Sequence, residues 1–132
     1  MVKSMNYRKF GNTGEKISAL GFGCMRFPEY EKDGKMYVDQ DKVDEMVAEA
    51  YRQGVNYFDT AHGYLQGKSQ LALREWRPSG YPRDRYVLTD KLTANFFKTE
   101  TDIRPFFQSQ LDACGVEYFD FYLMHAQGLT NY

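Results

Sequence analysis

Residues 55–64, VNYFDTAHGY, decide how this sequence is expected to fold. They begin with a four-residue apolar run, long enough for one buried strand, and the run ends in Asp59. A carboxylate is almost never buried without a partner, because removing a charge from water is costly. We therefore expect Asp59 to meet a cation. We predict that Lys91 is this cation, that Tyr64 is an acid at the same place, and that His125 is the third polar group there.

Short strands alternate with amphipathic helices along the chain. Two extended runs around an Asn/Gly-rich turn predict an N-terminal hairpin, over residues 7–10 and 16–18. Parallel strands are expected over residues 19–23, 55–58, 86–92 and 118–124, and a loop over residues 27–38. The first helix is expected between a cap at Asp39 or Asp41 and Gly54, and the second over residues 68–76, stopping before Pro78.

The third helix has a defect in its first turns. Thr99 and Asp102 form a capping-box pattern, and Gly115 marks the end of the apolar stripe. Pro105 lies inside this segment and removes a backbone donor. We expect Pro105 either to kink the first turn or to delay the start of the helix.

Strands that alternate with helices fit two architectures, an open doubly wound sheet or a (β/α)8 barrel. Asp59, Lys91 and His125 each stand at the end of a successive predicted strand, and in a barrel such ends meet at one mouth. The segment GFGCMR is not the dinucleotide pattern of open sheets, because Arg26 replaces its third glycine. We predict the first half of a (β/α)8 TIM barrel, with a hairpin and about four βα units, since a whole barrel needs ~250 residues.

Composition excludes several functions. The chain has 132 residues with a formal net charge of −1, so we expect one domain and no nucleic-acid partner. No apolar run approaches the ~20 residues that span a bilayer, and the N-terminus has no signal-like apolar segment. Cys24 and Cys114 lie far apart and are expected to be free thiols in the cytoplasm. A metal site from His62, Asp59 and His125 is disfavoured, because no further nitrogen or sulfur ligand supports it.

Five segments together resemble the aldo-keto reductase family. They are KFGNTGEKIS, ALGFGCMR, GVNYFDTAHGY, TDKL and FDFYLMHA, in the family's order over nearly the whole chain. The chain is most similar to a prokaryotic type, some members of which carry a C-terminal iron–sulfur domain. The resemblance implies that residues 1–132 are the N-terminal half of a TIM-barrel domain.

The resemblance also implies a reaction. Members reduce aldehydes and ketones with a nicotinamide cofactor, usually NADPH, and the matching positions here are Asp59, Tyr64, Lys91 and His125. Tyr64 would act as the general acid toward a small carbonyl substrate, and a nearby ammonium favours loss of its proton. Gly23 and Met25, with Asp59, would contact the cofactor. The family's main phosphate-binding part is absent from this chain, which predicts a truncated domain that need not be active alone.

Three positions depart from the family's pattern. Leu65 follows Tyr64 where many members have glycine or histidine. Gln70 stands where a glutamate commonly follows the serine, and Asp90 precedes Lys91 where a small or hydroxyl residue is usual. We expect the extra carboxylate of Asp90 to perturb Lys91.

Each candidate residue also has a purely structural interpretation. Asp59 could cap the following loop, Lys91 could be an ordinary strand-end lysine, and His125 could be a satisfied core histidine. The alternative function is a non-catalytic half-barrel module that forms a homodimer through its open sheet edges.

Overall fold

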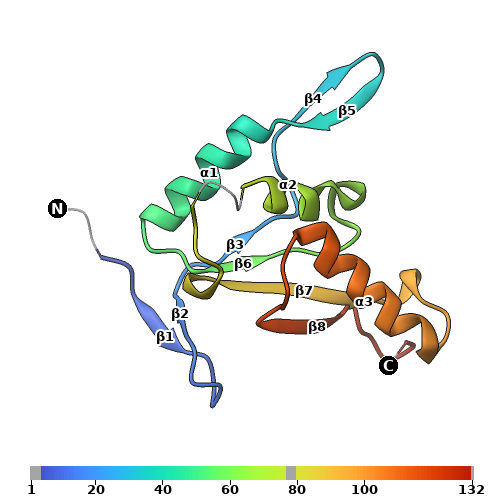
Figure 1. Cartoon of the computed structure of the whole chain (residues 1–132). Helices are drawn as coiled ribbons and strands as arrows, with labels where there is room; N and C mark the ends of the chain where they lie inside the picture. The colour runs from blue at the N-terminus through green and yellow to red at the C-terminus, as the bar shows by residue number, and fades with distance from the viewer. Residues whose placement is uncertain (1–3, 77–79, 132) are drawn as a thin grey trace.

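The computed structural model describes residues 4–76 and 80–131. At its centre lies a sheet of four parallel strands, in the order β3 (Phe22–Gly23), β6 (Tyr57–Asp59), β7 (Val87–Thr93) and β8 (Phe121–His125) (Figure 1). The spatial order follows the chain without reversal, so the sheet lacks the switch point at which open doubly wound sheets bind ligands. This arrangement is the one predicted for part of a (β/α)8 barrel.

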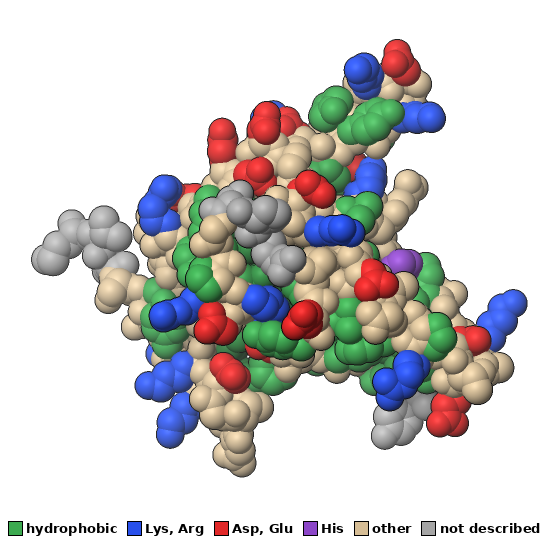
Figure 2. All heavy atoms as spheres, viewed as in Figure 1, with side chains coloured by type: hydrophobic (Ala, Val, Ile, Leu, Met, Phe, Trp, Pro, Cys, Tyr) green, Lys and Arg blue, Asp and Glu red, His purple; other side chains and the backbone are tan. Residues whose placement is uncertain are grey.

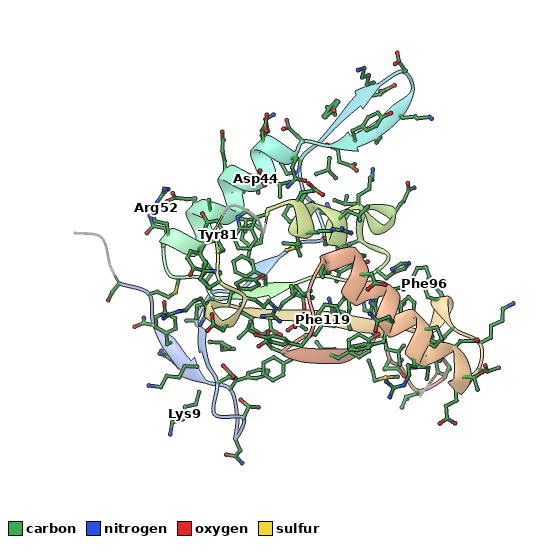
Figure 3. All side chains as sticks on the ribbon, in the orientation of Figure 1. Lys9, Asp44, Arg52, Tyr81, Phe96 and Phe119 are labelled. Atoms are coloured by element: carbon green, nitrogen blue, oxygen red, sulfur yellow. The ribbon has the colours of Figure 1, made fainter. Side chains whose placement is uncertain are left out.

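Three helices cover one face of the sheet. They are α1 (Gln40–Arg52), α2 (Lys68–Trp76) and α3 (Glu100–Cys114), and each packs against the next. A single apolar core joins all three helices to the sheet residues Phe58 and Leu88. The aromatic side chain of Tyr81, in the loop after α2, completes this core by stacking on Trp76 (Figure 3). The expected end of α2 before Pro78 lies outside the described residues.

The helix starts follow the capping signals. Asp39 accepts a hydrogen bond from the backbone N–H of Lys42 at the start of α1. Thr99 and Asp102 form the predicted capping box of α3, which begins at Glu100 and continues through Pro105. The expectation that Pro105 delays the helix is therefore wrong, because the capping box fixes the first turn before the chain reaches the proline.

Two hairpins stand beside the sheet. The predicted N-terminal hairpin is present as β1 (Tyr7–Lys9) and β2 (Lys16–Ser18). The predicted loop over residues 27–38 is wrong, because β4 (Glu29–Lys32) and β5 (Lys35–Val38) form a second hairpin that projects from the body in Figure 1. Asp33 and Gly34 join these strands with φ values of 52° and 74°, as a tight hairpin turn requires.

The strand predicted over residues 19–23 is shorter than expected. Only Phe22–Gly23 pairs with β6, and Leu20 is 63% exposed. The hydroxyl of Ser18 donates a hydrogen bond of 2.6 Å to the carbonyl of Leu20, which turns the chain before β3 begins. Short 3-10 turns complete the connections, at Tyr64–Gly67, Arg83–Arg85 and Ala94–Phe96.

The surface carries mixed charges. Figure 2 shows Lys and Arg side chains interspersed with Asp and Glu over the face in view. Within residues 4–76 and 80–131, no helix has the length and apolar character needed to cross a bilayer.

Candidate active site

Strand register places three of the predicted site residues on one face of the sheet. Asp59 pairs with Thr89 across β6 and β7, and His125 pairs with Thr93 across β7 and β8. Alternate residues of a strand share a face, so Lys91, between Thr89 and Thr93, points to the same side as both partners. This face is opposite to the one that packs against the helices.

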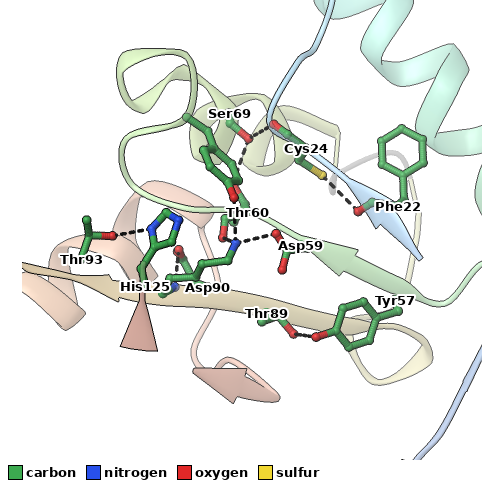
Figure 4. A network of polar contacts seen from close by, with 12 residues as sticks. Phe22, Cys24, Tyr57, Asp59, Thr60, Ser69, Thr89, Asp90, Thr93 and His125 are labelled. Carbon is green, nitrogen blue, oxygen red and sulfur yellow. Dashed lines mark hydrogen bonds and ion pairs between the residues drawn. The ribbon is translucent and has the colours of Figure 1, made fainter. Parts of the chain in front are cut away.

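The ammonium group of Lys91 is the centre of the site (Figure 4). Its Nζ donates to Oδ1 of Asp59 at 2.5 Å, to the backbone carbonyl of Thr60 at 2.8 Å and to the hydroxyl oxygen of Tyr64 at 3.2 Å. An ammonium has three protons, so these three acceptors satisfy it completely. Asp59 has therefore met the predicted cation, and Tyr64 lies against the same nitrogen.

The pair of Lys91 and Asp59 is partly shielded from water. The Lys91 side chain is 9% exposed and that of Asp59 is 28% exposed. Burial alone would lower the pKa of Lys91, but hydrogen bonds to Asp59 and Tyr64 and the charge of Asp59 outweigh it, so the pKa of Lys91 lies above its ordinary value. Lys91 is therefore an ammonium throughout the neutral range.

A tight turn after β6 brings Tyr64 to this nitrogen. The backbone N–H of Tyr64 donates to the carbonyl of Ala61 at 3.2 Å. Leu65 and Gln66 follow with φ values of 52° and 57°, a left-handed conformation that costs a non-glycine residue roughly 1–2 kcal/mol. The centroid of the Tyr64 ring also lies 4.7 Å from Nζ of Lys91.

His125 closes the other side of the site. Its Nδ1 lies 2.8 Å from the hydroxyl of Thr93, and its ring meets that of Tyr64 edge-on, with the centroids 5.9 Å apart. Burial lowers the pKa of His125, and the nearby charge of Lys91 lowers it further. The imidazole is therefore neutral at neutral pH.

Of the two residues predicted to contact a cofactor, Gly23 lies beside Asp59, and Met25 follows two residues later in the chain. Gly23 is the register partner of Asp59, and the backbone N–H of Cys24 donates to the carbonyl of Asp59 at 2.8 Å. A Cβ atom at Gly23 would have no heavy atom within 4 Å, and Met25 is 52% exposed. The space over this end of β3 is open, so a planar ring would fit there next to Asp59.

Sequence reasoning missed a layer of buried polar side chains behind the site. Gln70, Asp90 and Gln110 are fully buried between the sheet and the helices α2 and α3. Two of the departures from the family pattern contact each other, since Nε2 of Gln70 donates to Oδ2 of Asp90 at 2.7 Å. Burial raises the pKa of Asp90 to about 6, although the hydrogen bonds from the Lys91 N–H and from Gln70 act to lower it.

The two cysteines are free, as predicted, and the structure shows that both are buried. Burial raises the pKa of both thiols above the ordinary value, so neither is a thiolate at neutral pH. His62 contacts other residues: its Nδ1 lies 3.2 Å from Oε1 of Gln70, and its ring meets that of Phe96 edge-on, with the centroids 4.6 Å apart (Phe96 is labelled in Figure 3).

Comparison with known proteins identifies the family. The family model described as "Aldo/keto reductase family" matches residues 19–131. Norsolorinic acid reductase B of Dothistroma septosporum is 32% identical over 99 residues, which are 74% of this chain and 25% of that protein. A protein of Schizosaccharomyces pombe named as an aryl-alcohol dehydrogenase is 32% identical over 117 residues, 86% of this chain and 32% of its own length.

Solved structures agree on the fold. A Bacillus halodurans aldo-keto reductase in its holo form superposes with a TM-score of 0.73 and 26% identity, over 90% of this chain and 40% of that one. An aldo-keto reductase of Klebsiella pneumoniae in complex with NADPH gives a TM-score of 0.76 at 20% identity. The superposition covers 96% of this chain and 41% of that one. The chain thus spans about a quarter to a third of these curated relatives and less than half of these structures. It belongs to the aldo/keto reductase family of oxidoreductases.

Proposed function

We propose that this site performs the proton-transfer half of a carbonyl reduction that depends on NAD(P)H. The observation that carries the proposal is the position of the Lys91 ammonium, which joins the Asp59 carboxylate to the hydroxyl of Tyr64. An ammonium beside a phenol oxygen stabilises the phenolate that remains after the proton has left. Tyr64 is therefore the general acid in this proposal.

The other groups have supporting roles. Asp59 holds Lys91 in place and balances its charge in a partly shielded site. His125 is neutral, and the proposal assigns it the tautomer in which Nδ1 accepts from the Thr93 hydroxyl and the opposite ring nitrogen carries a proton for the substrate oxygen. The carbonyl oxygen would then lie between Tyr64 and His125, whose rings are neighbours.

A reduced nicotinamide would supply the hydride when bound. The open space over Gly23, next to Asp59, would take the ring of such a group, and the exposed Met25 is proposed to contact it. NADPH is the proposed form, in line with the Klebsiella pneumoniae structure that contains it.

The substrate class is proposed to be an aryl aldehyde or ketone. The names of the relatives, an aryl-alcohol dehydrogenase and a norsolorinic acid reductase, support this choice. The test is to add NADPH and 4-nitrobenzaldehyde to the chain and to follow NADPH fluorescence and absorbance. Binding with turnover supports the proposal, whereas an absence of NADPH binding at millimolar protein concentration refutes it for this chain.

A second candidate function is self-association. Among the described residues β8 is the last strand of the sheet, and Leu123 and Met124 on it are 41% and 58% exposed. An apolar strand at a free edge is a template for pairing with another strand. We propose a cytoplasmic homodimer through this edge, which Met124→Lys should dissociate in sedimentation velocity experiments. A wild-type chain that sediments as a monomer at all concentrations would refute it.

A further inference from the structure

The backbone of Lys91 lacks a partner strand on one side. β6 ends at Asp59, and the last backbone bond between the strands runs from the N–H of Thr60 to the carbonyl of Thr89, at 2.9 Å. Residues two apart on a strand bond to the same neighbour, so the N–H and C=O of Lys91 point to where β6 has ended. The next carbonyl, that of Thr60, accepts from the Lys91 side chain instead.

A side chain from its own strand satisfies the N–H of Lys91. Oδ1 of Asp90 accepts this N–H at 2.8 Å, and Oδ2 accepts from Nε2 of Gln70 on α2 at 2.7 Å. A carboxylate only accepts hydrogen bonds, so the amide nitrogen of Gln70 must face it and the amide oxygen must face His62. Asp90 is thereby held in one orientation.

A side chain from α3 satisfies the C=O of Lys91. Nε2 of Gln110 donates to this carbonyl at 2.9 Å. The hydroxyl of Tyr122 in turn donates to Oε1 of Gln110, which fixes the amide. Both peptide groups of Lys91 are thus bound by fully buried side chains, one linked to α2 and one carried by α3.

We propose that Asp90 and Gln110 are positioning residues for Lys91, which hold its backbone so that the ammonium remains between Asp59 and Tyr64. The proposal deepens the carbonyl-reductase function and rests on it for its catalytic meaning. Within residues 4–76 and 80–131, no other group bonds the N–H or C=O of Lys91, and a packed apolar layer would leave both peptide groups without a partner. A polar layer in the core is therefore required where the lysine must stay in one place.

The charge state of Asp90 depends on the groups around it. Its ionisable neighbours are Lys91, Asp59, Cys114, Tyr122 and, through Gln70, His62. Among these groups, Lys91 carries the positive charge that stabilises the ionised carboxylate of Asp90, whereas the negative charge of Asp59 destabilises it. The hydrogen bond to the Lys91 N–H should strengthen as Asp90 ionises, because charged acceptors make stronger bonds.

The test measures the Lys91 amide by NMR in the full chain. Asp90→Ala removes the acceptor and should speed hydrogen exchange of the Lys91 amide at least about tenfold, whereas Asp90→Asn keeps an acceptor oxygen and should restore slow exchange. Asp112→Ala is the control, because Asp112 forms the same kind of pair with Gln108 on the exposed face of α3. Unchanged exchange in a folded Asp90→Ala protein would overturn the proposal.

The wild-type chain provides a second test that needs no variant. The amide proton of Lys91 should shift with pH as Asp90 titrates, with a midpoint near its pKa of about 6. A Lys91 amide shift that does not follow the titration of the Asp90 side-chain carboxyl carbon, measured on the same samples, would overturn the proposal.

Catalysis is measured separately, with NADPH and 4-nitrobenzaldehyde. Asp90→Ala and Gln110→Ala should lower kcat with little change in KM, and Asp90→Asn should recover kcat. Full kcat in both alanine variants would contradict positioning. If the wild-type chain shows no turnover, the proposed function fails, and the amide measurements still decide whether Asp90 and Gln110 hold Lys91.

Discussion

Lys91 and Asp59, 32 positions apart in the sequence, form an ion pair of 2.5 Å between neighbouring parallel strands. The pair exists because β6 and β7 run in the same direction and end at the same edge of the sheet. Tyr64 reaches the same ammonium from the turn that follows β6. Asp59 and Tyr64, which are five residues apart in the chain, therefore both contact the same ammonium group.

Replacing Tyr64 by Phe tests the general acid. The variant keeps the ring that packs beside Lys91 and His125 and removes only the hydroxyl. We expect loss of turnover by at least about 100-fold, the usual contribution of general acid catalysis, with NADPH binding unchanged. Steady-state rates with 4-nitrobenzaldehyde measure the effect. Tyr37→Phe is the control, because Tyr37 is on the projecting hairpin. Equal rates in wild type and Tyr64→Phe would remove Tyr64 from the mechanism.

Replacing Lys91 by Met tests the ion pair as a structural element. The change leaves the carboxylate of Asp59 without its cation in a partly shielded site, and we expect a loss of about 1–3 kcal/mol in the free energy of unfolding. Urea denaturation at pH 7 measures it.

Lys42→Met is the matched control for this variant. Lys42 pairs with Asp39 at 3.5 Å, and its side chain is 66% exposed where that of Lys91 is 9% exposed. An exposed pair should lose less than about 1 kcal/mol. If both variants lose the same free energy of unfolding, the Lys91–Asp59 pair does not stabilise the fold more than an exposed pair does.

The sequence alone located the site but not its support. Asp59, Lys91 and His125 could be predicted because parallel strands bring their ends together, and the family resemblance added Tyr64. The layer of Gln70, Asp90 and Gln110 could not be predicted, because a polar residue on a strand or helix does not reveal which buried partner it faces. The hydrogen bond from Gln70 on α2 shows that Asp90 points toward the helices, and its neighbour Lys91 points to the opposite face.

The second hairpin shows a different limit. Its strands, EYEK and KMYV, carry charges that hide the alternation of apolar and polar residues. Asp33 and Gly34 between them were a usable signal, because this pair favours tight hairpin turns. The stacking of Tyr30 on Tyr37, with centroids 5.7 Å apart, supports the hairpin and depends on a strand pairing that the sequence pattern did not show.

The pH dependence of stability tests the burial of Asp90. The folded-state pKa of about 6 lies above the ordinary value of 3.8, so the folded protein binds this proton more tightly than the unfolded chain does. The resulting stability is present below pH 4 and is lost as the pH rises through 6. Asp90→Asn has no such proton, and we expect its stability relative to wild type to improve by on the order of 2–3 kcal/mol between pH 4 and 7.5.

Urea denaturation of both proteins at several pH values measures this difference. Asp112→Asn, at an exposed position of α3, provides the baseline and should show a much smaller change. If the difference between Asp90→Asn and wild type does not change with pH, Asp90 has an ordinary pKa in the folded protein.

Gly54→Ala tests how the N-terminal segment is joined to the sheet. Gly54 has a φ of 97°, and a Cβ atom there would lie 2.8 Å from Cβ of Met5 and 2.9 Å from the hydroxyl of Tyr7, which donates to the Gly54 carbonyl. The matched control is Gly14→Ala, with a φ of 82° and no heavy atom within 4 Å of the added carbon. The backbone strain shared by both variants costs about 1–2 kcal/mol, and the clash with Met5 should add about 1–3 kcal/mol to Gly54→Ala alone. Equal losses in thermal denaturation would mean that the N-terminal segment moves away from Gly54 at little cost.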